Sequence, residues 1–366
     1  MTGIAAGAFG AVGGERLVLP SSLTFIEEGA FTSVSAERLY LFDGLVSVRD
    51  ASFGALNVGT LYVNALRDPV YCGTYFDTLS QKIDYLASVA EERKLILFCG
   101  SSARFGYDSA ALEAAFPSYR VVDMGVYAYA NMLPQALLLL PYLREGDVIL
   151  SSPELDAIEE QFCATDRMDR ETWCMLESNY DMLTLLDCRA LSGVFDAFGA
   201  YQAARLSLPA RGYDEVPSMF DEDRVPCDTP SYNKYGDYVL HRPDNVDGRL
   251  FGVKRAAFDP DAISEACWAG LDRVFGAFAE RGAEVLFTWS PRSRRSVTAG
   301  STPEAIAALG AEARERLRAR VISDPEDALM EALWFYGTDN HLSTNGAALH
   351  TQKVIEDLTP WLEVTP

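Results

Sequence analysis

Apolar residues recur at a fixed interval of 22 positions near the start of the chain. Residues 15–31 and 37–53 align on each other without a gap. The positions in register are Ile4, Ile26 and Val48; Phe9, Phe31 and Phe53; and Leu39 and Leu41 with Leu61 and Val63. Repeats of this length with a Leu-x-Leu core stack one short strand per unit on the next. The pattern predicts parallel rungs over residues 15–65, carrying Leu17/Leu19, Leu39/Leu41 and Leu61/Val63.

From residue 78 onward, short apolar runs alternate with amphipathic stretches. Strands are predicted at 94–99, 119–124, 147–150, 284–289 and 320–323. Helices are predicted at 79–93, from Asp259-Pro260 to Gly282, from Thr302-Pro303 onward, and at 344–358. Strands separated by helices predict an α/β fold, with a three-layer, doubly wound parallel sheet of the flavodoxin type.

Residues 155–258 interrupt this alternation. The first part, to about residue 208, has a helical pattern, whereas the rest is rich in Pro, Asp, Gly and Tyr and predicts a long ordered loop. Its segment 231–245 (SYNKYGDYVLHRPDN) is aromatic and polar enough to line a pocket, although a surface excursion explains it equally well. The pattern thus predicts a repeat domain over 1–66 and an α/β domain over 78–366 with an insertion at 155–258.

The chain of 366 residues carries 31 Lys and Arg against 53 Asp and Glu, a formal net charge of −22. This acidity argues against a nucleic-acid partner, and no apolar run predicts a transmembrane segment. The seven cysteines never fall in Cys-x-x-Cys spacing, which argues against a zinc site and a disulfide framework and favours a reducing compartment. No secretory signal is recognised at the start. We expect a cytoplasmic location if the N-terminus is native, and a secreted or cell-surface one if the chain is a fragment.

The repeat has a characteristic amino-acid sequence, LPSSLTFIEEGAF over residues 19–31. It resembles the leucine-rich repeats of bacterial BspA-type surface proteins, and the resemblance covers roughly residues 1–65. It implies a short leucine-rich-repeat solenoid whose face recognises a protein partner. The alternative is a solenoid stub that only packs on the domain that follows.

The predicted strand at 94–99 leads into Gly100-Ser101-Ser102. A serine at a tight turn between a strand and a helix exposes its Oγ, and the helix N-terminus favours developing negative charge. The stretch LILFCGSSARFGYDS resembles the first sequence block of SGNH/GDSL-type hydrolases, in which Gly-Asp-Ser is usual. This resemblance covers roughly residues 80–360. It implies that Ser102 is the nucleophile and that Ser101 occupies the Asp position.

A second motif lies near the C-terminus, FYGTDNHLSTNGAALHT. It resembles the fifth SGNH block, in which an acid and a histidine share one loop, and it implies His341 as the base that removes the serine proton. The usual Asp-x-x-His spacing would place the acid at Thr338, so Asp339 is the orienting acid that we expect. His241, in the insertion, and His350, in the last helix, are expected to have surface or packing roles.

Ester hydrolysis also needs hydrogen-bond donors for the oxyanion. The resemblance implies the backbone N–H groups of Ser102 and Gly125, the latter matching the glycine of the second block. The third block normally supplies an asparagine, but the corresponding strand here ends ILSSPELD. Asn131 is the replacement that we expect, and Glu154 is a candidate substrate contact or alternative acid. No metal or cofactor motif is found, so neither is expected.

These blocks imply a serine esterase or O-acyl hydrolase that acts through Ser102, His341 and Asp339. Relatives with this appearance often act on acyl groups of cell-envelope polysaccharides, so a small-molecule or glycan acyl ester is the implied substrate. One alternative is an O-acyltransferase that uses the same residues. Another is a non-catalytic SGNH-like binding or scaffold protein that recognises partners through its repeats. The missing asparagine and the irregular acid spacing favour this last alternative.

Overall fold

The structure is a computed structural model, and it describes residues 2–72, 74–164, 166–211, 231–240, 242–244 and 254–362. The chain divides into two compact units. Unit 1 comprises Met1–Ser80, Leu133–Leu138 and Asp166–Ser218, and unit 2 comprises Gln81–Met132, Leu139–Thr165 and Met219–Pro366. Helices α1 (Thr78–Ser88) and α4 (Met132–Leu139) contribute residues to both.

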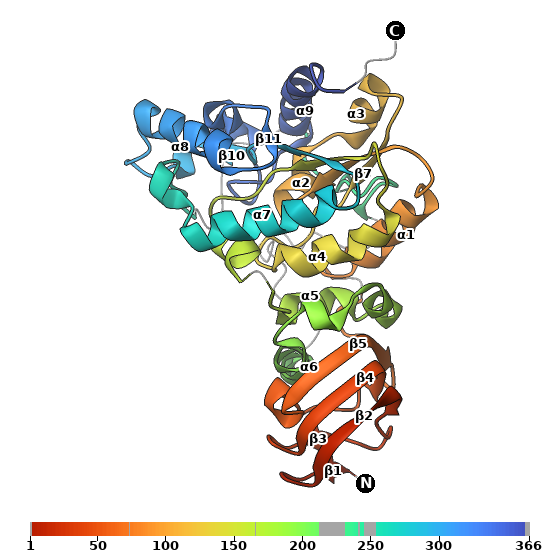
Figure 1. Cartoon of the computed structure of the whole chain (residues 1–366). Helices are drawn as coiled ribbons and strands as arrows, with labels where there is room; N and C mark the ends of the chain where they lie inside the picture. The colour runs from red at the N-terminus through yellow and green to blue at the C-terminus, as the bar shows by residue number, and fades with distance from the viewer. Residues whose placement is uncertain are drawn as a thin grey trace. The chain divides into compact units, whose positions relative to one another are not determined.

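Three parallel strands form the main sheet of unit 1, and Figure 1 shows them side by side in red and orange. They are β2 (Phe9–Val18), β4 (Phe31–Phe42) and β5 (Ala55–Asn64). Their register pairs residues 22 apart, as in Leu17 with Leu39 and Leu39 with Leu61. The short strands β1 (Gly3–Ile4) and β3 (Phe25–Ile26) keep the same register. The prediction of parallel rungs with a 22-residue period is therefore confirmed.

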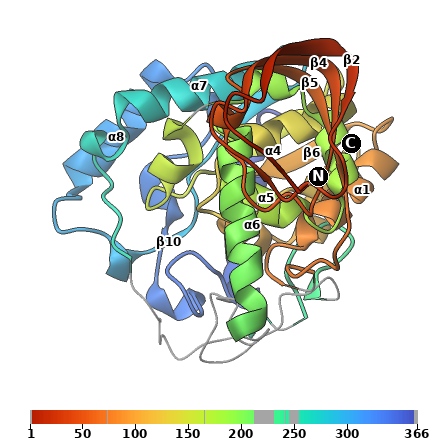
Figure 2. The ribbon, with the colours of Figure 1, turned by 90° about the horizontal axis from the view of Figure 1, so that it is seen from below.

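Helices from the first part of the insertion complete unit 1. They are α5 (Arg170–Leu176) and α6 (Val194–Arg211). Figure 2 shows α6 as a long green helix. The ring of Phe195 packs 4.4 Å from that of Phe53, which stacks on Phe31 in the rungs. The buried Arg205 pairs with Asp43 at 2.7 Å. The sequence analysis assigned this stretch to the α/β domain, whereas its contacts group it with the repeats, because its apolar side chains bury the Phe53 end of the rungs.

Unit 2 is built on a five-stranded, wholly parallel sheet. The strands are β6 (Lys94–Phe98), β7 (Arg120–Asp123), β8 (Val148–Ser151), β9 (Glu284–Phe287) and β11 (Arg320–Val321). Their order is β11-β9-β8-β6-β7, so the first strand in the chain lies inside the sheet. The chain turns from one side of β6 to the other there, and ligands of such sheets bind beyond the carboxyl ends of the strands at this point.

Helices cover both faces of this sheet. Apolar residues of one face form a cluster with α3 (Ser109–Ala115) and α9 (Thr344–Leu358). On the other face, Phe98 of β6 packs against Phe278 of α7 (Glu265–Ala279), with ring centroids 5.0 Å apart. Figure 1 shows α7 crossing in front of the strands. The prediction of an α/β fold with parallel sheets is confirmed.

The helix boundaries were predicted with mixed success. Helix α8 (Pro303–Arg316) begins after its N-cap Thr302, and α9 covers the expected residues. The helix expected from Asp259-Pro260 is only a 3-10 turn there, Pro260–Ala262, and α7 begins later behind its own N-cap Ser264. The short pair β10 (Arg292–Ser293) and β12 (Leu329–Met330) was not predicted. In the described part of the chain, no helix has the length and apolarity needed to cross a membrane.

Candidate functional site

The carboxyl end of β6 leads through Gly100 into the short helix α2 (Ser101–Gly106). The side chain of Ser101 is buried at the start of this helix, and its Oγ lies 3.0 Å from Nε2 of His341. His341 comes from the loop before α9, 240 residues further along the chain. The structure therefore brings together a serine and a histidine from the two motifs that the sequence analysis singled out.

The serine is not the one that we expected. Ser102 Oγ donates to Glu154 Oε1 at 2.7 Å, and the Ser102 backbone N–H donates to the same oxygen at 2.8 Å. The predicted contact between Ser102 and His341 is thus wrong, and Ser101 takes that place. Consecutive residues of a helix point about 100° apart, so neighbouring serines face different partners. The serine that reaches the histidine is the one that the resemblance did not single out as the nucleophile.

Glu154 holds this turn in place. Its side chain is buried, its Oε2 accepts hydrogen bonds from Gln161 and from the Cys99 thiol, and its Oε1 accepts both donors of Ser102. A Cβ on Gly100 would lie 2.6 Å from both carboxylate oxygens, so only glycine allows this close approach. Glu154 therefore positions the turn that carries Ser101, and it does not contact His341.

The imidazole of His341 is buried against an aromatic ring. Phe105 of α2 stacks on it with centroids 4.0 Å apart, and Tyr238 packs on the same phenyl ring. Burial lowers the pKa of His341 to about 3, with the positive charges of Arg104 and Arg242 adding to the effect. The imidazole is consequently neutral at ordinary pH, which is the form that can accept a proton from a serine.

The loop before His341 is held by a buried arginine. Arg292 Nη1 lies 2.7 Å from Asp156 Oδ1 and 2.6 Å from Asn340 Oδ1, and Asn340 in turn donates to Asp156 at 3.1 Å. All three side chains are nearly inaccessible. Because Asn340 directly precedes His341, this network fixes the position of the base. The sequence analysis missed Arg292 and Asp156, since nothing in a single sequence marks two lone charged residues as partners.

Asp339 lies in the same loop but does not orient the histidine. Neither of its carboxylate oxygens hydrogen-bonds His341, and the side chain is 2% exposed. Burial raises the pKa of Asp339, while the Arg292 guanidinium acts in the opposite direction. Asp339 lies two positions before His341, and successive side chains of a loop point in different directions. The expected Ser-His-Asp triad is therefore not assembled in this geometry.

The expected oxyanion donors are engaged elsewhere. The Gly125 N–H donates to Asp123 Oδ1 at 2.6 Å, and the Asn131 side chain donates to the carbonyl of Ala164. The Ser102 N–H is held by Glu154. Ser101 is the first residue of α2, so no carbonyl of the same helix accepts a hydrogen bond from its backbone N–H. That N–H is the donor that the local geometry favours in their place.

A cavity of about 280 Å³ adjoins the Ser101–His341 pair. Its lining includes both of these residues and also Tyr129, Asp156, Lys254 and Arg292. Gly125, Asn131, Ser102 and Glu154 do not line it. The Lys254 ammonium lies 4.4 Å from the centroid of the Tyr129 ring. Cavities that hold small ligands have volumes of roughly 300–1,000 Å³, so this one lies at the small end of that range.

The aromatic segment of the insertion contacts the helices next to the site. In its described part, Tyr232 accepts a hydrogen bond from Arg104 at 2.9 Å, and Asp237 accepts one from the Ser109 N–H. The buried Lys82 donates to the carbonyl of Gly236 at 2.7 Å. These residues do not line the cavity beside Ser101, and their contacts hold α1, α2 and α3 instead. His241 and residue 245 of this segment lie outside the described residues.

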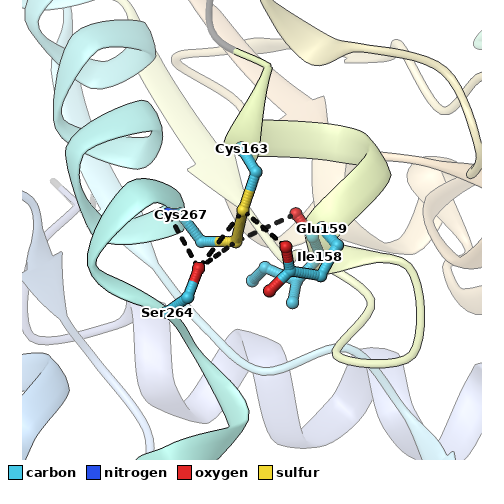
Figure 3. Close-up of a disulfide and its surroundings, with 5 residues drawn as sticks. All are labelled: Ile158, Glu159, Cys163, Ser264 and Cys267. Atoms are coloured by element: carbon cyan, nitrogen blue, oxygen red, sulfur yellow. Dashed lines mark hydrogen bonds between the residues drawn. A yellow bond between two sulfur atoms is a disulfide. The ribbon is translucent and has the colours of Figure 1, made fainter.

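One disulfide joins Cys163 to Cys267, 104 residues apart in the sequence (Figure 3). The sequence analysis argued against a disulfide framework and did not predict this pair, since spacing in sequence does not report proximity in the fold. Glu159 lies beside them and completes a group of three potential metal ligands. Two sulfurs that are bonded to each other are not thiolates, so the oxidised pair does not fit a metal ion.

The geometry of unit 2 is that of a serine–histidine pair at the edge of a parallel sheet. A scan of known protein families finds none that matches this chain, and a search of curated proteins finds no similar sequence.

Proposed function

We propose that the chain is an ester hydrolase of the SGNH type in which Ser101 is the nucleophile and His341 is its base. The observation that carries the proposal is the 3.0 Å distance between Ser101 Oγ and His341 Nε2 at the wall of a cavity. The strand order of the sheet and the place of Ser101 after an interior strand support it. The substrate is an acyl ester of a small molecule or a glycan.

The reaction proceeds by acyl transfer through the serine. The neutral His341 accepts the Ser101 hydroxyl proton at Nε2 while Oγ bonds to the ester carbonyl carbon, and the Ser101 N–H faces the developing oxyanion. The imidazolium then returns that proton to the leaving alkoxide as the C–O bond breaks. Water, deprotonated by the same nitrogen, attacks the acyl-enzyme and releases the acid. Glu154 and Arg292 position the serine and the histidine loop respectively.

We propose that unit 1 is a leucine-rich-repeat stack of the BspA type. The 22-residue register and the stacking of Phe9, Phe31 and Phe53 at centroid distances of 4.9 and 5.8 Å support this interpretation. Such stacks present a continuous surface that binds another protein. In this proposal unit 1 recognises a partner and unit 2 carries the chemistry.

One observation favours a non-catalytic alternative. The three oxyanion donors expected from the family blocks are all engaged within the protein, and Asp339 does not hydrogen-bond the histidine. Loss of one oxyanion donor costs an esterase about 10²–10³ in rate. In this alternative the site is vestigial, and the chain binds its partner without hydrolysing an ester.

The test compares two adjacent serines. Ser101→Ala removes the proposed nucleophile and should lower turnover of a chromogenic acetate ester by a factor on the order of 10⁴ or more. Ser102→Ala removes only a hydroxyl that donates to Glu154 and should retain most of the turnover. Melting temperatures control for folding of both variants. Loss of activity in Ser102→Ala alone, or no activity in the wild-type protein, would refute the proposal.

A further inference from the structure

The residues that position the site share one short segment. Residues 152–163 follow β8 and carry Glu154, which holds Ser102, and Asp156, which pairs with Arg292. The segment ends in one π-helical turn, Glu159–Cys163, from which Gln161 donates to Glu154 Oε2. The position of the Ser101 turn thus depends on where this segment lies.

The disulfide fixes the far end of that segment. Cys163 is its last residue, and Cys267 lies in the first turn of α7, which packs on the sheet through Phe278. Cys163 follows Gln161 by two residues in the same π-helical turn. Gln161 donates to Glu154, and Glu154 accepts from Ser102 beside the nucleophile. Asp156 anchors the segment through Arg292, and Asn131 holds the carbonyl of Ala164 just beyond its end, so loss of the disulfide would loosen the segment without releasing it.

The surroundings of the two sulfurs suit the reduced state as well as the oxidised one. Glu159 Oε2 lies 2.9 Å from Cys163 Sγ, and the carbonyl of Ile158 lies 3.6 Å from Cys267 Sγ (Figure 3). Each of these oxygens can accept the proton of a thiol once the bond is broken. Ser264 Oγ lies 3.3 Å from both sulfurs and can donate to the disulfide.

We propose that Cys163–Cys267 is a reversible thiol–disulfide exchange site that controls the position of Ser101. Cys163 is half-buried and Cys267 is fully buried, so an external thiolate reaches Cys163. Its attack forms a mixed disulfide and releases Cys267 as a thiolate, which takes up a proton. A second external thiolate then attacks the external sulfur of the mixed disulfide and releases Cys163 as a thiolate, which also takes up a proton. The two external thiols leave joined as a disulfide, so two electrons and two protons enter the protein. For its effect on turnover, the inference rests on the proposed function.

The experiment uses the full chain oxidised with glutathione disulfide or reduced with dithiothreitol. Alkylation followed by mass spectrometry reports the disulfide, and deuterium exchange reports the mobility of residues 152–163. We expect faster exchange in this segment on reduction and a fall in ester turnover of about tenfold, because displacements near 1 Å at a catalytic group have effects up to about 10². Reoxidation should restore both.

Two variants sharpen the result. Cys163→Ser cannot form the bond and should resemble the reduced protein whatever the redox conditions. Cys72→Ser changes an exposed cysteine outside the disulfide and should respond as the wild-type protein does. Equal exchange of residues 152–163 in the oxidised and reduced protein would overturn the inference, as would the absence of a disulfide after oxidation. If no form hydrolyses esters, the proposed function fails, while the exchange comparison still decides the inference.

Discussion

In the rungs of unit 1, seven residues of β4 pair with residues 22 positions before them in β2 and 22 positions after them in β5. In the site of unit 2, Ser101 meets a histidine 240 residues away, and the adjacent Ser102 meets a glutamate instead. A rung is specified many times over by a repeated pattern. The site depends on single contacts that no repeat duplicates. Because the side-chain direction changes with every residue, a shift of one position exchanges the serine that faces His341 for the one that faces Glu154.

The largest effect is expected at the cap of the rungs. Arg205 pairs with Asp43 at 2.7 Å and with Glu177 at 2.8 Å, and all three side chains are buried. Arg205→Ala would leave two carboxylates without their counter-charge, so we expect the free energy of unfolding to fall by about 3–5 kcal/mol. Urea denaturation measures this change. A loss below about 1 kcal/mol, typical of a surface pair, would contradict a role for these helices in holding the repeats.

Within the rungs, burial should decide the cost of a substitution. Leu39 is fully buried between Leu17 and Leu61, and Leu39→Ala should lower the unfolding free energy by about 2–5 kcal/mol. Val18 lies on the same sheet but is 48% exposed, so Val18→Ala should change it by about 0.5 kcal/mol or less. Equal losses in the two variants would show that the rungs do not stack as described.

At the site, adding one methyl group at Gly100 should be enough to abolish activity. A Cβ on Gly100 would lie 2.6 Å from the Glu154 oxygens and 2.7 Å from Ala128 Cα, so Gly100→Ala should cost about 1–3 kcal/mol and abolish ester turnover. Gly276 of α7 offers a matched control, because nothing lies within 4 Å of its added Cβ. Gly276→Ala should stabilise the protein by about 0.4–1 kcal/mol. Full activity in Gly100→Ala would remove Glu154 from its positioning role.

The smallest effect concerns pH. Burial lowers the pKa of His341 to about 3, so its protonated fraction is negligible from pH 5 to 8. The neutral imidazole is the base, and kcat/KM should therefore show no rise centred near 6.5, the ordinary histidine value. Measurement of kcat/KM for an acetate ester across this range checks the point. A rise centred near 6.5 would mean that the imidazole keeps its ordinary pKa and is more exposed than the structure has it.

Much of the architecture could be predicted from local signals. The period of 22 residues predicts the register of the rungs, and the N-cap Thr302 before Pro303 predicts the start of α8. Asp259-Pro260 gives the same signal but starts only a 3-10 turn, because Ser264 caps the helix that follows. Such signals act over a few residues, and neighbouring signals compete.

The site could be predicted only in outline. The motifs around Gly100 and His341 indicate which loops meet, but not which of two serines faces the histidine. Arg292, Asp156 and the Cys163–Cys267 bond depend on contacts between residues far apart in the sequence. No spacing rule covers such pairs, since the fold alone brings them together.

The most direct test of the account is to identify the residue that a fluorophosphonate probe labels. The probe forms a covalent bond only with an activated serine, and peptide mass spectrometry distinguishes Ser101 from Ser102. The account predicts labelling at Ser101, and loss of labelling in His341→Ala. Labelling at Ser102, or no labelling of the folded wild-type protein, would contradict it.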